Sequence, residues 1–100
     1  MAGFPGGSAW AAAKDIAEGY VLVTERTFGR FDGGQLEQLA FELDRALRDV
    51  RGEQPALDDL EAVQARNRKI LRLRGALSML RGYQQRRFRA GMRPKFDGNA

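Results

Sequence analysis

Residues 36–50 read LEQLAFELDRALRDV, and this stretch decides the fold. Its apolar residues recur at steps of three and four and fall in one narrow stripe of a helix. The stripe consists of Leu36, Leu39, Ala40, Leu43, Leu47 and Val50. Asp32 followed by Gln35 fits a capping box, and Gly52 follows the last turn. The sequence therefore predicts an amphipathic helix over residues 33–51.

A longer helical pattern follows after a short connection. Pro55 suits the first helical position, and the acidic residues after it favour the positive end of the helix dipole. The pattern runs to about residue 90, with Gly75 and Gly82 as places where the helix could bend or, at Gly82, end early. We therefore expect a helix over residues 55–90. A connection of about three residues makes it an antiparallel neighbour of helix 33–51.

The segment before this hairpin predicts a third helix, over residues 9–28. Ser8 can cap it, and an apolar stripe follows. The stripe contains Trp10, Ala13, Ala17, Tyr20, Val21, Thr24 and Phe28. Residues 20–24 are rich in strand formers, but no second strand candidate exists to pair with them. Because a lone strand leaves its backbone groups unpaired, we favour a helix here.

The expected fold is all-α. Three helices form either a three-helix bundle or a long antiparallel hairpin with the shorter N-terminal helix packed on it. A length of 100 residues corresponds to one domain. We expect a flexible lead at 1–7, a single helical domain at 8–90 and a flexible basic tail at 91–100.

The composition argues against an enzyme. The chain has no Cys and no His, which excludes disulfides, thiol nucleophiles, imidazole bases and the usual zinc sites. Asp58, Asp59 and Glu61 form the tightest acidic cluster, but they stand at a helix start, where acids are expected anyway. We therefore expect no catalysis, no cofactor and no metal. The apolar runs are too short for a membrane span, so we also expect a cytoplasmic protein.

The net charge of +4 conceals a strong asymmetry. Residues 1–65 hold 6 basic and 12 acidic groups, whereas residues 66–100 hold 11 basic groups and one acid. Arginines can neutralise phosphates and aromatic rings can stack on bases. The candidate nucleic-acid-binding residues are Arg81, Tyr83, Arg86, Arg87, Phe88, Arg89, Arg93 and Lys95. The alternatives are that the acidic helices screen this segment or that it meets an acidic protein or membrane surface, and no known nucleic-acid-binding motif is present.

Two features suggest a protein partner. Phe41 points roughly opposite the leucine stripe, where a large aromatic is either a lone surface residue or a partner contact. Leu71, Gly75, Ser78 and Gly82 form a second face on the long helix. One hairpin partner cannot cover both faces of that helix. The first helix or a second copy of the chain would have to cover this one.

Asn67 lies within the apolar stripe of the long helix. A buried amide there could set the register or the oligomeric state, or the residue could simply lie at the frayed edge of the stripe. Both interpretations stay open at this stage. The plan of two or three amphipathic helices with a basic, Asn-containing last helix (Ala65–Leu71) resembles small helical flagellar or type III export chaperones over residues 33–85. The shared pattern is a generic amphipathic one, and it implies only a chaperone-like kind of role.

These observations lead to one main functional hypothesis. We expect a non-enzymatic, helical protein–protein interaction module with an adaptor, assembly or chaperone-like role, which also forms homo-oligomers. The candidate partner-binding residues are Phe41, Leu71, Gly75, Ser78 and Gly82. The alternative is a nucleic-acid-binding accessory protein that uses the basic segment 66–95. The partner and the pathway are left open.

Overall fold

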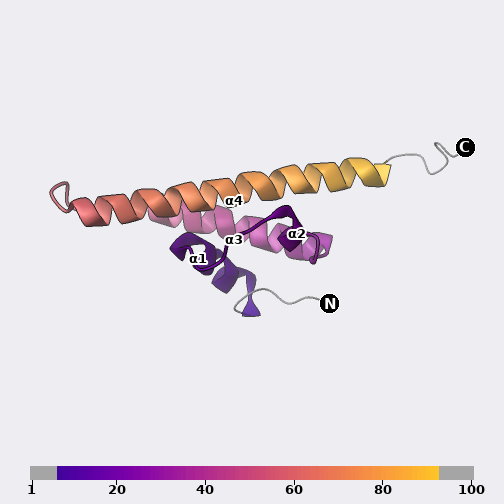
Figure 1. Ribbon diagram of the computed structural model, residues 1–100, viewed down its shortest axis with the longest axis horizontal. Coiled ribbons are helices and arrows are strands. Elements are labelled where there is room, and N and C mark those ends of the chain that lie inside the picture. Colours follow the sequence, from indigo (N-terminus) through magenta and orange to yellow (C-terminus); the bar gives the residue numbers. More distant parts are fainter. Residues whose placement is uncertain (1–6, 93–100) are drawn as a thin grey trace, which may run out of the picture.

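A computed structural model describes the backbone of residues 7–92 and the side chains of residues 7–90, and it shows four helices (Figure 1). They are α1 (Ala9–Glu18), α2 (Glu25–Phe28), α3 (Gly33–Arg51) and α4 (Leu60–Met92). α3 and α4 run antiparallel, and α1 packs on both of them. No strand occurs in the part described. The predicted all-α hairpin with a shorter N-terminal helix packed on it is confirmed.

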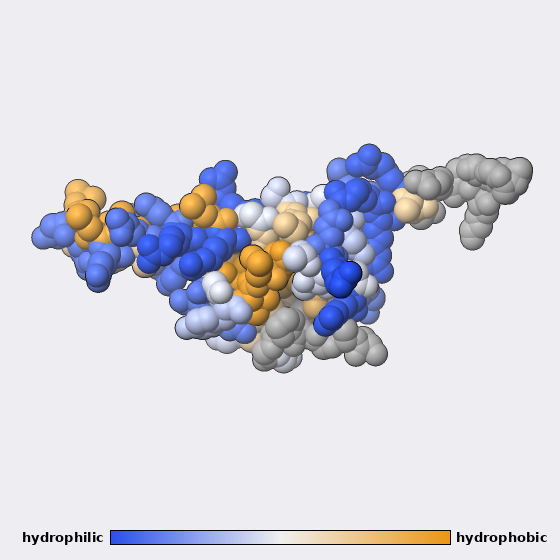
Figure 2. All heavy atoms as spheres, in the orientation of Figure 1, coloured by the Kyte–Doolittle hydropathy of each residue, from blue (hydrophilic) through white to orange (hydrophobic). Residues whose placement is uncertain are grey.

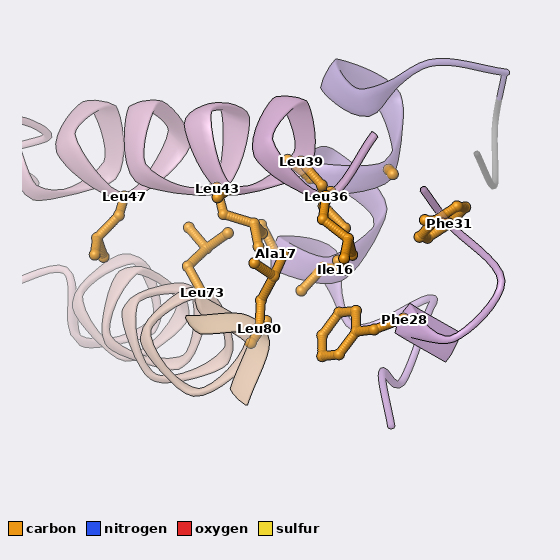
Figure 3. Close-up of a cluster of buried hydrophobic side chains, with 14 of the residues drawn as sticks. Ile16, Ala17, Phe28, Phe31, Leu36, Leu39, Leu43, Leu47, Leu73 and Leu80 are labelled. Atoms are coloured by element: carbon orange, nitrogen blue, oxygen red, sulfur yellow. The ribbon is translucent and has the colours of Figure 1, made fainter. Parts of the chain in front are cut away.

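The core forms where α1, α3 and α4 meet (Figure 3). Every residue of the predicted α3 stripe, from Leu36 to Val50, is buried. α1 contributes small side chains and Ile16, so that it can approach the hairpin closely. Only the middle of α4 is fully buried, at Leu73, Ala76 and Leu80. Burying each large apolar side chain contributes about 1.5–3 kcal/mol, so this stripe is the main source of stability.

The predicted continuous helix over 9–28 is wrong, because the chain leaves the helix at Gly19. This glycine has a φ of 84°, in the left-handed region that side chains other than glycine rarely adopt. The N–H of Tyr20 donates to the carbonyl of Asp15 at 2.9 Å, and the N–H of Gly19 donates to that of Ile16 at 3.1 Å. These two bonds form a Schellman motif, which ends α1.

Residues 20–23 are extended, yet they belong to no sheet. Val21 and Val23 pack against the core, so this segment buries β-branched side chains without a strand partner. The chain then enters α2 through a capping box in which Thr24 and Thr27 bond to each other's backbone N–H. The expected stripe is also wrong at Trp10 and Tyr20, which are 54% and 78% exposed.

α4 begins at Leu60 rather than at the predicted residue 55. The side chain of Asp59 accepts a hydrogen bond from the N–H of Ala62 at 3.1 Å, as an N-terminal cap does. Pro55 therefore lies in the connection between α3 and α4 rather than in the first turn. The helix continues through both internal glycines and ends at Met92. Most of the predicted lead and tail, residues 1–6 and 93–100, lies outside the described residues.

Candidate interaction surfaces

The predicted second face of α4 points into solvent. Leu71 is 67% exposed, and Ser78 is exposed as well. A Cβ added at Gly75 would meet nothing within 4 Å, and one added at Gly82 would meet only the Arg86 side chain. The first helix therefore leaves most of this face exposed, and only its end, at Ile16 and Gly19, borders it.

Part of this face joins the extended segment 20–23 to form an apolar groove. The α4 groove, as we name it, is a depression of about 330 Å³ formed chiefly by Val21, Leu22, Leu71, Gly75, Ala76 and Met79. Figure 2 shows the apolar patch at the centre of the visible surface, where segment 20–23 runs beside α4. The groove unites two of the predicted residues, Leu71 and Gly75, but not Ser78 or Gly82.

Four of these groove residues were not predicted as site residues, and Leu22 is the most exposed of them. It is 89% exposed and projects from a segment expected to be helical. The break at Gly19 places it opposite Leu71 and Met79 across the groove. A possible signal was present in the sequence, since Gly19 and the Thr24–Thr27 pair have the spacing of a helix stop and a helix start.

One arginine lines the groove, and two more are exposed on the same helix. Arg72 lines it, and its guanidinium Nη1 donates to the carbonyl oxygen of Ala17 at 3.0 Å. Arg68 and Arg74 are exposed on the same helix, and within residues 7–92 neither forms an ion pair. The sequence contains no acidic residue between Glu61 and Asp97. The α4 side of the groove therefore carries net positive charge.

The basic far end of α4 is more strongly engaged than the sequence suggested. Arg81 pairs with Glu37 at 3.2 Å, and Arg86 pairs with Glu25. Arg87 donates to the carbonyl oxygen of Phe31 at 2.8 Å. The acidic residues of the preceding helices thus reach two of the arginines proposed for nucleic-acid binding.

The other members of the nucleic-acid set are in different environments. The half-buried ring of Tyr83 lies 5.8 Å from that of Phe28, centroid to centroid, so it belongs to the packing. Phe88 and Arg89 are exposed. Arg93 and Lys95 lie outside the described residues. The structure therefore does not bring the predicted set together as one free basic surface.

A second apolar surface surrounds Phe41. This side chain is 58% exposed, and together with Trp10 it lines a depression whose other walls include Gln38, Glu37 and Glu42. We name this the Trp10–Phe41 surface. The ammonium of Lys14 lies 5.2 Å from the centroid of the Trp10 ring, a cation–π distance. Charges of both signs therefore border the two aromatic rings.

Asn67 is exposed, and its side-chain oxygen accepts only a long hydrogen bond of 3.4 Å from Arg66. This agrees with the interpretation that it lies at the edge of the apolar stripe. Arg66 itself donates to the carbonyl oxygens of Arg51 and Glu53, each at 2.9 Å. It thereby satisfies backbone groups at the end of α3.

One further cleft in the described part of the chain is small. The cleft between α1 and α3, lined by Trp10, Glu18 and Glu42 among others, holds only about 80 Å³. Typical ligand pockets measure roughly 300–1,000 Å³. Within residues 7–92, no three acidic side chains gather as a metal site would require. None of the helices described there is long and apolar enough to cross a bilayer.

Comparison with protein-family models, with curated proteins and with solved structures finds no match to this chain. The resemblance to export chaperones therefore has no support beyond the generic amphipathic pattern.

Proposed function

We propose that this chain is a non-enzymatic helical interaction module that binds another protein and also associates with itself. One observation carries the proposal. The helices bury a complete apolar core, yet two groups of large apolar side chains stay exposed, at the α4 groove and at the Trp10–Phe41 surface. Single exposed apolar residues are ordinary, but grouped ones are typical of interaction sites.

The Trp10–Phe41 surface is suited to a second copy of the chain. In a two-fold dimer each residue i of one copy meets residue j of the other, and the reverse contact forms as well. Lys14 lies beside Trp10, and Glu42 lies beside Phe41. In a two-fold dimer, Lys14 of each copy can therefore meet Glu42 of the other. The surface is therefore self-complementary in sign, and its aromatic rings supply apolar area for the contact.

Self-association is tested by sedimentation velocity over a wide range of concentration. We expect the wild type to form dimers as the concentration rises, and Phe41→Ser to weaken the dimer by about tenfold or more. Leu57→Ser is the control, because Leu57 is 91% exposed and lies in the connection between α3 and α4. A wild type that stays monomeric throughout, or equal effects of both variants, would contradict self-association through this surface.

Protein binding is tested by affinity capture from native lysate, with and without nuclease. We expect captured proteins to survive nuclease treatment and to be lost with the variant carrying both Phe41→Ser and Leu71→Ser. Loss of all captured material on nuclease treatment would favour the nucleic-acid alternative instead.

Nucleic-acid binding ranks second. Arg86 and Arg87 would have to exchange their contacts with Glu25 and the Phe31 carbonyl for phosphates. Exposed Arg68, Arg74 and Arg89 still favour some affinity for polyanions. Such binding would fall steeply with salt, and absence of binding to DNA and RNA at about 50 mM salt would exclude it.

A further inference from the structure

The α4 groove has the shape and composition of a seat for a helix. Leu22 lines the groove from segment 20–23, and Leu71 and Met79 line it from α4. Gly75 lies between Leu71 and Met79 on α4 and has no side chain to fill the groove. No side chain projects at Gly75, so a partner backbone can approach α4 closely at this point. Amphipathic helices bind such grooves with apolar anchors spaced at i, i+3, i+4 and i+7.

The charges around the groove restrict what can occupy it. Arg68 and Arg74 lie on either side of Leu71 along the exposed face, and neither has a carboxylate partner among the described residues. Arg72 uses its guanidinium on a neutral backbone carbonyl, so its positive charge is not cancelled. Among the acids of α1 and α2, Glu18 pairs with Lys69 and Glu25 pairs with Arg86, while Asp15 directly precedes Ile16 of the groove lining.

A second copy of the chain is a poor occupant of this groove. A two-fold contact through the α4 groove would bring the arginines of one copy against the same arginines of the other. Like charges facing each other across an interface suppress that pairing. Carboxylates on a partner would instead meet unpaired guanidinium groups, whose fork geometry suits them.

We propose that the α4 groove binds an amphipathic helix of a partner protein that has an apolar stripe flanked by Asp and Glu. The proposal rests on the proposed interaction function and adds to it the binding surface and the chemical class of the partner. It assigns the groove to a heterologous acidic partner and leaves self-association to the Trp10–Phe41 surface.

The experiment selects binders from a displayed library of amphipathic helices. The apolar stripe is fixed, and each flanking position is randomised among Glu, Gln and Lys. The bait is the full chain. Expected binders are enriched in Glu on both flanks, and their affinity falls with added salt.

Matched variants locate the binding site. Gly75→Gln places a bulky, neutral, helix-compatible side chain in the groove, where its Cβ meets open space, so the fold is preserved. We expect it to raise the Kd of the selected helices by about tenfold or more. Arg68→Glu with Arg74→Glu, which flank Leu71 along α4, should do the same, whereas the charge reversal Arg89→Glu, far along α4 from Leu71, should have a much smaller effect.

Each opposite result overturns the proposal. These results are an absence of enriched binders, enrichment of Gln or Lys flanks, and equal affinity for the wild type and Gly75→Gln. A change in the oligomeric state caused by Gly75→Gln would assign the groove to a second copy. If RNA displaced the selected helices and Gly75→Gln abolished the binding of that RNA, the groove would be assigned to nucleic acid. The Phe41→Ser sedimentation result is independent of this selection, so failure of the acidic-helix proposal is distinguishable from failure of the proposed function.

Discussion

Arg72 donates a hydrogen bond from its guanidinium Nη1 to the carbonyl oxygen of Ala17, a residue 55 positions earlier in the chain. That carbonyl is one of the last in α1, where no further turn of helix supplies a donor. A cation at this place also interacts favourably with the negative end of the helix dipole. The bond ties α1 to α4 at the point where the chain breaks at Gly19.

The first prediction concerns this bond. Arg72→Ala should lower the free energy of unfolding by about 1–2 kcal/mol, because a charged hydrogen bond to a partly buried carbonyl is lost. Urea denaturation followed by circular dichroism measures it. Arg74→Ala is the control, since Arg74 has no ion-pair partner in the described structure, and it should change stability by less than about 0.5 kcal/mol. Equal effects would mean that the Arg72 bond contributes little.

The second prediction separates two glycines of opposite conformation. Gly19→Ala should destabilise the fold by about 1–3 kcal/mol, because it forces a side chain to a φ of 84° and places a Cβ 3.0 Å from Arg72. Gly75→Ala should stabilise it by about 0.5–1 kcal/mol, since Gly75 is in a helix with open space around it. Thermal melts of both variants decide this, and a stabilising Gly19→Ala would show that the chain does not turn as described.

The third prediction tests the core. Leu43→Ala should cost about 2–5 kcal/mol, because the side chain is fully buried between α3 and α4. A loss of this size can approach the whole stability of a domain of 100 residues, so the variant should melt far below the wild type. Leu57→Ala, at a site that is 91% exposed, should leave the melting temperature nearly unchanged. A similar shift for both would be inconsistent with this core.

The fourth prediction concerns the ion pair between Arg86 and Glu25. Both side chains are more than half exposed, so a double-mutant cycle with Arg86→Ala and Glu25→Ala should give a coupling energy of no more than about 1 kcal/mol. The coupling should shrink in high salt. A larger, salt-insensitive coupling would indicate that a partner or another group buries this pair.

The sequence was most informative where a single helical face does all of the packing. The residues from Leu36 to Val50 repeat with the period of a helix, and all of the predicted positions are buried. The helix predicted over Tyr20 to Val23 is wrong for a physical reason. Their apolar side chains are compatible with the helical stripe, and the turn at Gly19 depends on one backbone conformation that glycine permits but does not require.

The candidate surfaces were only partly predictable. Phe41, Leu71 and Gly75 stand out from helical spacing alone, since spacing tells which side of a helix each residue occupies. Leu22 and Trp10 join them through tertiary placement, which depends on where α1 ends and on how it crosses the hairpin. Arginine bonds to distant carbonyls have no local signal at all.

The long-range arginine bonds also bear on how the chain can assemble during its synthesis. Arg72 reaches Ala17 and Arg87 reaches Phe31 across separations of 55 and 56 residues. Helices α1 and α2 thus have no access to these donors until α4 has been made, and α3 alone offers them only part of their packing. In a nascent chain arrested before α4 emerges, α1 and α2 should therefore be only weakly packed. The fold should form cooperatively only once α4 has been made.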